Sequence, residues 1–167
     1  MAELTNLESK LAEVLGLAMA ARDATSTIRR LVEREDGDDT LVAMLDRMGD
    51  EAEETERRCT DLAGSFDGKK TAIVEQARET RREATEMMET YLGKDADALD
   101  GFEFLTMAEA GEVGHWRIVE VLGRRAGSSD VHGLVDWALP IQQRHFEEAQ
   151  RGSLALAEAE DPNETAA

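Results

Sequence analysis

The sequence has few of the residues that form disulfides, interrupt helices or provide large aromatic side chains. Among its 167 residues are one Cys and two Pro, and only 4% are aromatic. The lone Cys59 excludes an intramolecular disulfide and a cysteine-based metal cluster, and it predicts a cytoplasmic protein with Cys59 buried in the core. No run of 18 apolar residues and no charged-then-apolar leader is present, so we expect neither a membrane span nor a signal peptide.

Positive charge is also scarce. The chain has 19 Lys and Arg against 37 Asp and Glu, a net charge of -18. Because binding to phosphates needs a basic surface, this balance predicts no nucleic-acid partner and no attraction to anionic membranes. Lys is especially rare, which suits either a halophilic source or a GC-rich genome, and the sequence leaves both open.

Motifs for nucleotide or nucleophilic chemistry are absent from the sequence. No glycine-rich phosphate loop follows a strand pattern, so nucleotide chemistry has no support. Cys59 has no His at a matching depth in the pattern, and no Ser-His-Asp set is apparent.

What the chain does contain is a helical period of apolar residues in long runs rich in Ala, Leu, Glu, Arg and Met. This pattern predicts an all-α fold without strands. We expect five helices, at about 5–35, 39–66, 70–92, 97–125 and 130–157. Asp38 or Asp39 is expected to cap the second helix, and Pro140 to bend the fifth. Short turns between helices favour an antiparallel bundle, here one domain at 1–157 followed by a flexible acidic tail at 158–167.

The fourth predicted helix places acids where a core face is expected. In 102-FEFLTMAEAGEVGHWRIVEVLG-123, one stripe contains Phe102, Leu105, Glu109, Glu112, Trp116 and Val119. Burying an unpaired carboxylate costs several kcal/mol, so such an acid is normally paired, protonated or bound to a cation. His115 follows Glu112 at the Glu-x-x-His spacing with which helical bundles hold di-iron or di-manganese centres. An exposed flank or a Glu–Arg pair is the alternative.

Other predicted helices bring further acids and a His near their inward faces. Glu51 and Glu54 lie on either side of the apolar seam of the second helix, and His145 lies near that of the fifth. Glu8 lies beside the seam of the first, although 5-TNLE-8 also has the pattern of a capping box. In the third helix, Met87 and Tyr91 are expected to point inward. The candidate metal ligands are Glu8, Glu51, Glu54, Glu109, Glu112, His115 and His145.

With these residues assembled, the chain resembles the ferritin-like stress-response family that includes the bacterial proteins YciE and YciF. The resemblance spans about residues 7–150, and it is carried by 8-ESKLAEVL-15, 51-EAEETERRCTDLAGSF-66 and 109-EAGEVGHW-116. It implies a ferritin-like antiparallel four-helix bundle with an additional helix. It also implies a homodimer with an iron or manganese centre that acts in stress or redox responses.

The sequence departs from the pattern of this family at several ligand positions. A family His of the second helix is Glu51 here, and another is Arg58. The paired acids of the last helix fall on Ile141 and Gln142, which removes charge and a bridging ligand from a two-metal site. His145 keeps the Glu-x-x-His spacing with Gln142 and could replace part of the lost set.

Two functional hypotheses therefore stay open. In the first, the protein is a di-iron or manganese redox protein whose main carboxylates are Glu54, Glu109 and Glu112. In the second, it is a metal-free structural or partner-binding bundle in which the inward acids pair with arginines, namely Arg57, Arg58 or Arg144.

Overall fold

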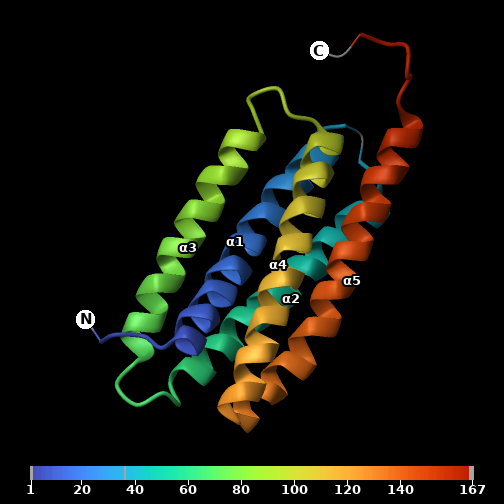
Figure 1. The fold of residues 1–167 in the computed structure, drawn as a ribbon. Helices are drawn as coiled ribbons and strands as arrows, with labels where there is room; N and C mark the ends of the chain where they lie inside the picture. The colour runs from blue at the N-terminus through green and yellow to red at the C-terminus, as the bar shows by residue number, and fades with distance from the viewer. Residues whose placement is uncertain (1, 36, 166–167) are drawn as a thin grey trace.

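The computed structural model describes residues 2–35 and 37–165, and this part of the chain contains five helices and no strand (Figure 1). The helices are α1 (Asn6–Arg34), α2 (Asp39–Ala63), α3 (Lys70–Tyr91), α4 (Ala98–Ala126) and α5 (Ser129–Ala159). The prediction of an all-α fold is confirmed. The single domain at 1–157 stays a prediction; Met1 and Asp36, which fall within it, lie outside the described residues.

Local side-chain chemistry explains where most of the helices begin and end. Thr5 and Glu8 form the predicted capping box, with Thr5 N–H 2.7 Å from Glu8 Oε2 and Glu8 N–H 3.3 Å from Thr5 Oγ1. Asp38 caps α2, and a second capping box begins α4 at Asp97. Gly127 ends α4 in the left-handed region at φ 65°, where glycine has no steric penalty.

The end of α2 differs from the predicted one, because the helix stops at Ala63 and not at Phe66. Gly64 is a poor helix former, and its N–H bonds back to the Thr60 and Asp61 carbonyls. Gly68, at φ 68°, then completes the turn into α3. Phe66 still packs against the core from this turn. The apolar pattern therefore predicted that Phe66 faces the core, but not that it lies outside the helix.

The predicted tail is in part helical. Helix α5 extends through 158 and 159, and residues 160–165 are exposed and outside any helix. Ala166 and Ala167 lie outside the described residues, and the flexibility of the tail stays a prediction. The helix also continues through Pro140, which is exposed.

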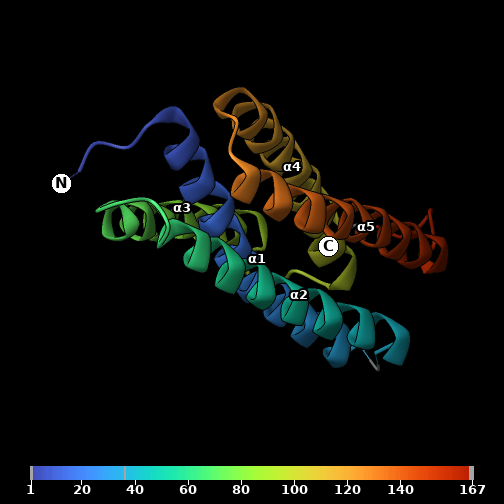
Figure 2. The ribbon, with the colours of Figure 1, turned by 90° about the horizontal axis from the view of Figure 1, so that it is seen from below.

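Helix α1 makes the most extensive packing contacts of the five helices. It packs against α2, α3 and α4, while α4 packs against α5, and α2 makes a smaller contact with α5. Helices α1, α3 and α5 run in one direction, and α2 and α4 run in the other (Figure 1). Seen from below, the α4–α5 pair lies over one side of α1, and α2 and α3 lie on its other sides (Figure 2).

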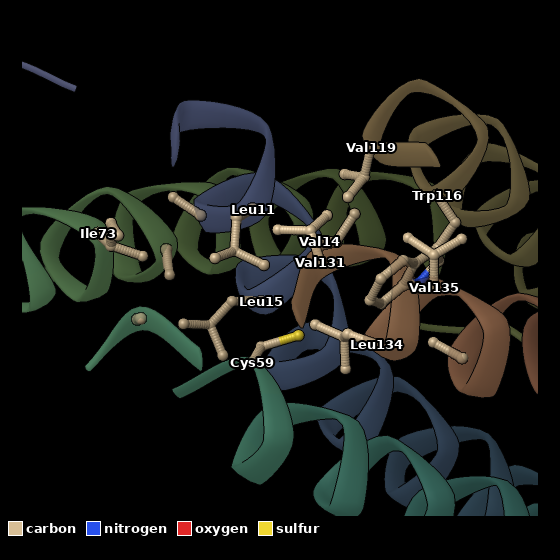
Figure 3. Close-up of a cluster of buried hydrophobic side chains, with 14 of the residues drawn as sticks. Leu11, Val14, Leu15, Cys59, Ile73, Trp116, Val119, Val131, Leu134 and Val135 are labelled. Atoms are coloured by element: carbon tan, nitrogen blue, oxygen red, sulfur yellow. The ribbon is translucent and has the colours of Figure 1, made fainter. Parts of the chain in front are cut away.

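Two apolar clusters fill the interior at opposite ends of the molecule. The first surrounds the start of α1 and contains Trp116 and Cys59, both fully buried (Figure 3). The second lies towards the other end and is built around Ile28, Phe102 and Leu105. Each large apolar side chain buried in this way contributes about 1.5–3 kcal/mol. Burial also raises the pKa of the Cys59 thiol far above its usual range, so this Cys is an unreactive core residue, as predicted.

The predicted inward stripe of α4 is confirmed, because all six of its members are buried, both acids included. The prediction for α3 was wrong at its end. Met87 is 66% exposed and Tyr91 42% exposed, whereas Met88 is buried. A straight helix drifts relative to a strict seven-residue repeat, and α3 packs mainly on α1, so its last turns rotate a different residue inward.

None of the helices in the described residues is long and apolar enough to cross a membrane.

Candidate functional site

A layer of polar side chains lies between the two apolar clusters. Glu109, Glu112, Gln142 and His145 are each at least nine-tenths buried, from α4 and α5, and α2 adds the half-buried Glu51. Burying so many polar groups at one level costs free energy unless they satisfy one another. This layer is therefore the strongest candidate for a functional site.

His145 joins three helices at the centre of this layer. Its Nε2 atom lies 2.6 Å from Glu51 Oε2 of α2, and its Nδ1 atom lies 3.7 Å from Glu109 Oε2 of α4. The Gln142 side-chain amide donates to the same Glu109 oxygen. At the outer edge, the Arg144 guanidinium donates to the second oxygen of Glu51. We call these five residues the polar network.

The electrostatics of the polar network shift the pKa values of His145 and Glu51 in opposite directions. Burial lowers the pKa of His145, but Glu109 and Glu51 outweigh it and leave that pKa raised. Burial raises the pKa of Glu51, but the hydrogen bonds from His145 and Arg144 outweigh it and leave that pKa lowered. The raised pKa of His145 and the lowered pKa of Glu51 together favour a charged imidazole beside a charged Glu51 carboxylate.

Glu112 stands apart from the polar network. It is 5% exposed, and it makes no hydrogen bond or ion pair with any described residue. Burial, together with the nearby charge of Glu109, raises its pKa well above the usual value. A buried acid without a partner is most stable as the neutral carboxyl group.

Glu112 also lines a cavity of about 300 Å³ between α1, α3 and α4. Glu109 and His115 are the other ionisable groups in its lining, and the remaining lining residues are almost all apolar or small. On α1 these are Leu17, Ala20, Ala21 and Ala24. The alanines leave space that larger side chains would have filled.

The remaining candidate ligands lie away from the polar network. Glu54 turns outward and pairs with Arg57 at 2.7 Å and Arg58 at 2.7 Å, and these two arginines lower its pKa to about 2. His115 Nδ1 lies 3.1 Å from Glu13 Oε2 of α1. Glu8 belongs to the capping box at the start of α1. It precedes Ala20 of the cavity by twelve positions, which at the rise of an α-helix is about 18 Å.

The donors present do not match a two-metal centre. Ferritin-like sites take a Glu from each of two helices and a Glu-x-x-His pair from each of the other two. Here α1 offers alanines, Glu54 is held by arginines, and Gln142 supplies an amide in place of a carboxylate. In the described part of the chain, no three His, Cys, Asp or Glu side chains form a group arranged to hold a metal.

The sequence identified most of this layer but missed two features. The pairing of His115 with Glu13 went unrecognised, although Glu13 lies on the first helix near its apolar seam. The cavity was also missed. Its signal in the sequence is the small-residue run 18-AMAARDA-24 on a helix that is otherwise rich in larger apolar residues.

Comparison of this chain with protein-family models, with curated proteins and with solved structures found no significant match.

Proposed function

We propose that this protein is a metal-free ferritin-like bundle that works as a structural, partner-binding module. In this proposal α1, α2, α4 and α5 form the four-helix bundle, and α3 is the additional helix. The packing supports it, because α1 with α2 and α4 with α5 form two antiparallel hairpins. Helix α3 packs on the outside of the first hairpin and returns the chain from the end of α2 to the start of α4. One long crossover between two hairpins is the connectivity of ferritin-like folds.

The polar network is the observation that carries the proposal. It occupies the level between the two cores at which bundles of this kind build their sites. Glu51, Glu109 and His145 each have protein partners there, with Arg144 and Gln142 completing the set. A network of satisfied charges fixes how α2, α4 and α5 are aligned, which is a structural role.

The partner that we propose is a second copy of the chain, docked through the outer face of α4. Three apolar residues of this face are at least 42% exposed, namely Met107, Ile118 and Val121. Between them, Gly111 and Gly114 have no neighbouring atoms within 4 Å of a Cβ position, so another helix could approach closely there. Large exposed apolar residues gathered on one face commonly mark protein interfaces.

The charges of α4 favour an antiparallel pair of these faces. The start of the helix is acidic, with Asp100 and Glu103, and its end is basic, with Arg124 and Arg125. A two-fold axis between Gly111 and Gly114 would place the acidic start of one copy beside the basic end of the other. Such a self-complementary patch is what a two-fold dimer requires. With a net charge of -18 the proposal includes no nucleic acid, and it assigns the protein to the cytoplasm.

The test of the metal-free proposal is metal uptake with a matched control. The wild-type protein is exposed to ferrous iron or manganese without oxygen, desalted, and measured by elemental analysis and thermal melting. We expect less than one metal per ten chains and an unchanged melting temperature.

Variants decide whether any bound metal belongs to the polar network. His145→Gln removes its central group, and His132→Gln removes an exposed His of the same helix. One or more metals per chain that persist in His132→Gln and disappear in His145→Gln would establish the iron or manganese alternative.

A further inference from the structure

The cavity between α1, α3 and α4 has an apolar wall and one unpartnered acid. Met88, Leu105 and the alanines of α1 line it, and the exposed Met87 and Met107 stand among its lining residues on α3 and α4. Flexible thioether side chains at a rim can adapt to the shape of a ligand. The volume of about 300 Å³ is at the lower end of the range typical of small-molecule sites.

Glu112 gives this apolar space its chemical character. The residue is 5% exposed and lines the cavity, and its carboxyl group has no partner among the described residues. Glu109, the other acid of the lining, already contacts Gln142 and His145. His115 Nδ1 lies 3.1 Å from Glu13 Oε2 without forming a hydrogen bond. Glu112 is therefore the acid of the lining that is free to bind a cationic ligand.

We propose that this cavity binds a small amphiphilic cation, in which an alkyl chain lies along the apolar wall and a primary ammonium group contacts Glu112. The ammonium supplies three N–H donors and the positive charge that the surroundings of Glu112 lack. A charge-assisted hydrogen bond of this kind, formed away from water, discriminates strongly against a ligand without the charge. The alkyl chain supplies affinity in proportion to the area it buries.

Two other ligand classes fit the cavity less well. A fatty acid would place its carboxylate beside Glu109 and Glu112, two acids that offer it no positive charge. An alcohol of the same length would fill the apolar wall equally but would bring no positive charge, so Glu112 would stay a neutral carboxyl group and its hydrogen bond would not be charge-assisted. The three classes therefore differ in one group and can be compared directly.

The experiment is calorimetric titration of the full chain with hexylamine, hexan-1-ol and hexanoate in 0.3 M salt, roughly three times the ionic strength at which the Debye length is about 10 Å. The salt matters because a chain with a net charge of -18 attracts any cation weakly. We expect hexylamine to bind at least about tenfold more tightly than hexan-1-ol, and hexanoate not to bind. Heptylamine should bind about fourfold more tightly than hexylamine.

Three variants locate the binding. Glu112→Gln should remove the preference for the amine over the alcohol, whereas Glu120→Gln makes the same change of charge on α4 outside the cavity and should keep it. Ala84→Phe fills the cavity from α3 and should abolish binding of both ligands. Circular dichroism confirms that each variant is folded.

The proposal is overturned if amine and alcohol bind the wild type equally, or if no probe binds. It is also overturned if Glu120→Gln weakens amine binding as much as Glu112→Gln, since the attraction would then be a property of the whole acidic surface. These outcomes do not depend on metal uptake. Because Met107 and Gly111 also belong to the proposed dimer face, the titrations are made on Ile118→Glu as well as on the wild type. Amine binding to either protein that Glu112→Gln removes supports the cavity, whether or not the chain dimerises.

Discussion

His145 is the residue through which α5 contacts acids of both α2 and α4. It is 3% exposed and lies between Glu51 and Glu109, so its removal leaves a buried carboxylate without its cation. Removing one partner of a buried ion pair costs more free energy than replacing both partners with apolar residues, because the remaining charge stays buried without a counter-charge. The polar network should therefore be most sensitive at this residue.

We predict that His145→Gln lowers the free energy of unfolding by about 3 kcal/mol at pH 6. The raised pKa of His145 sets the sign of the pH dependence. The stabilisation is fully present below the unfolded value of 6.5 and is lost as the pH rises through the higher folded value. Urea denaturation should show that the difference in free energy of unfolding between the variant and the wild type is smaller at pH 9 than at pH 6. His132→Gln, at an exposed His, is the control, and a pH-independent difference would contradict the charged-imidazole interpretation.

Removing Glu112 should have the opposite effect from removing His145, because Glu112 is a buried acid without a partner, although stability again falls as the pH rises. Its folded pKa is raised above the value of 4.5, so the folded state keeps a proton that the unfolded chain releases. Stability is thus lost as the pH rises from 4.5 towards the folded value, by up to about 1.4 kcal/mol per pH unit.

We predict that Glu112→Gln is more stable than the wild type at pH 7 and close to it at pH 4. Denaturant unfolding of both proteins at the two pH values measures this, with Glu120→Gln as the control for loss of one half-buried charge that pairs with Arg117 on the same helix. A variant less stable than the wild type at pH 7 would show that Glu112 makes a stabilising contact as the carboxylate.

At the scale of single helices, the sequence predicted the features that depend on neighbouring residues in the chain, namely helix starts and the buried face of α4. The capping box at Thr5 and Glu8 and the cap at Asp38 fix where helices begin, and both are visible as short patterns. The α4 stripe was predictable because the helical period alone decides which residues share a face. The exposure of Met87 was not, because it depends on how many neighbours α3 has, which is a property of the packing.

Glu54 and the cavity illustrate two further limits of sequence reasoning. Glu54 flanks the seam of α2, and its direction was decided by contacts with Arg57 and Arg58 that compete with the interior. The cavity depends on the spacing of α3 and α4 around α1. That spacing is set by the close approach of α1 and α3 at Gly16, where a Cβ would come well inside 3.0 Å of the Ala77 carbonyl oxygen.

We predict that Gly16→Ala destabilises the protein by about 1–3 kcal/mol, because the added methyl group meets backbone that cannot move without shifting α3. Gly133→Ala is the matched control. It lies within α5 with no neighbouring atom within 4 Å, so it should stabilise the helix by up to about 1 kcal/mol. Thermal melting of the two variants should give shifts of opposite sign. Equal shifts would mean that α3 is not held closely on α1.

At the scale of the whole molecule, two apolar clusters fill the interior towards the two ends and the polar network lies between them. The outer face of α4 takes no part in these clusters or in the polar network, and it is available for contact with another molecule. The acidic surface keeps copies apart unless a specific patch brings them together, so self-association must rely on complementary charges and close approach. The α4 face has both, with its exposed apolar residues, its open glycines and its opposite charges at the two ends.

We predict that the wild type is a dimer at micromolar concentration and that Ile118→Glu makes it a monomer, because each copy would place a new carboxylate in an apolar contact. Leu154→Glu is the matched control, since Leu154 is an exposed apolar residue of α5, 60% accessible, outside this face. Sedimentation velocity measures the mass of each variant, and melting curves confirm that both are folded. Because the proposed contact aligns acidic and basic ends, an Arg125→Glu variant should also weaken the dimer, and combining it with Asp100→Arg should restore it. A wild type that sediments as a monomer, or a Leu154→Glu variant that dissociates as fully as Ile118→Glu, would remove α4 as the dimer interface.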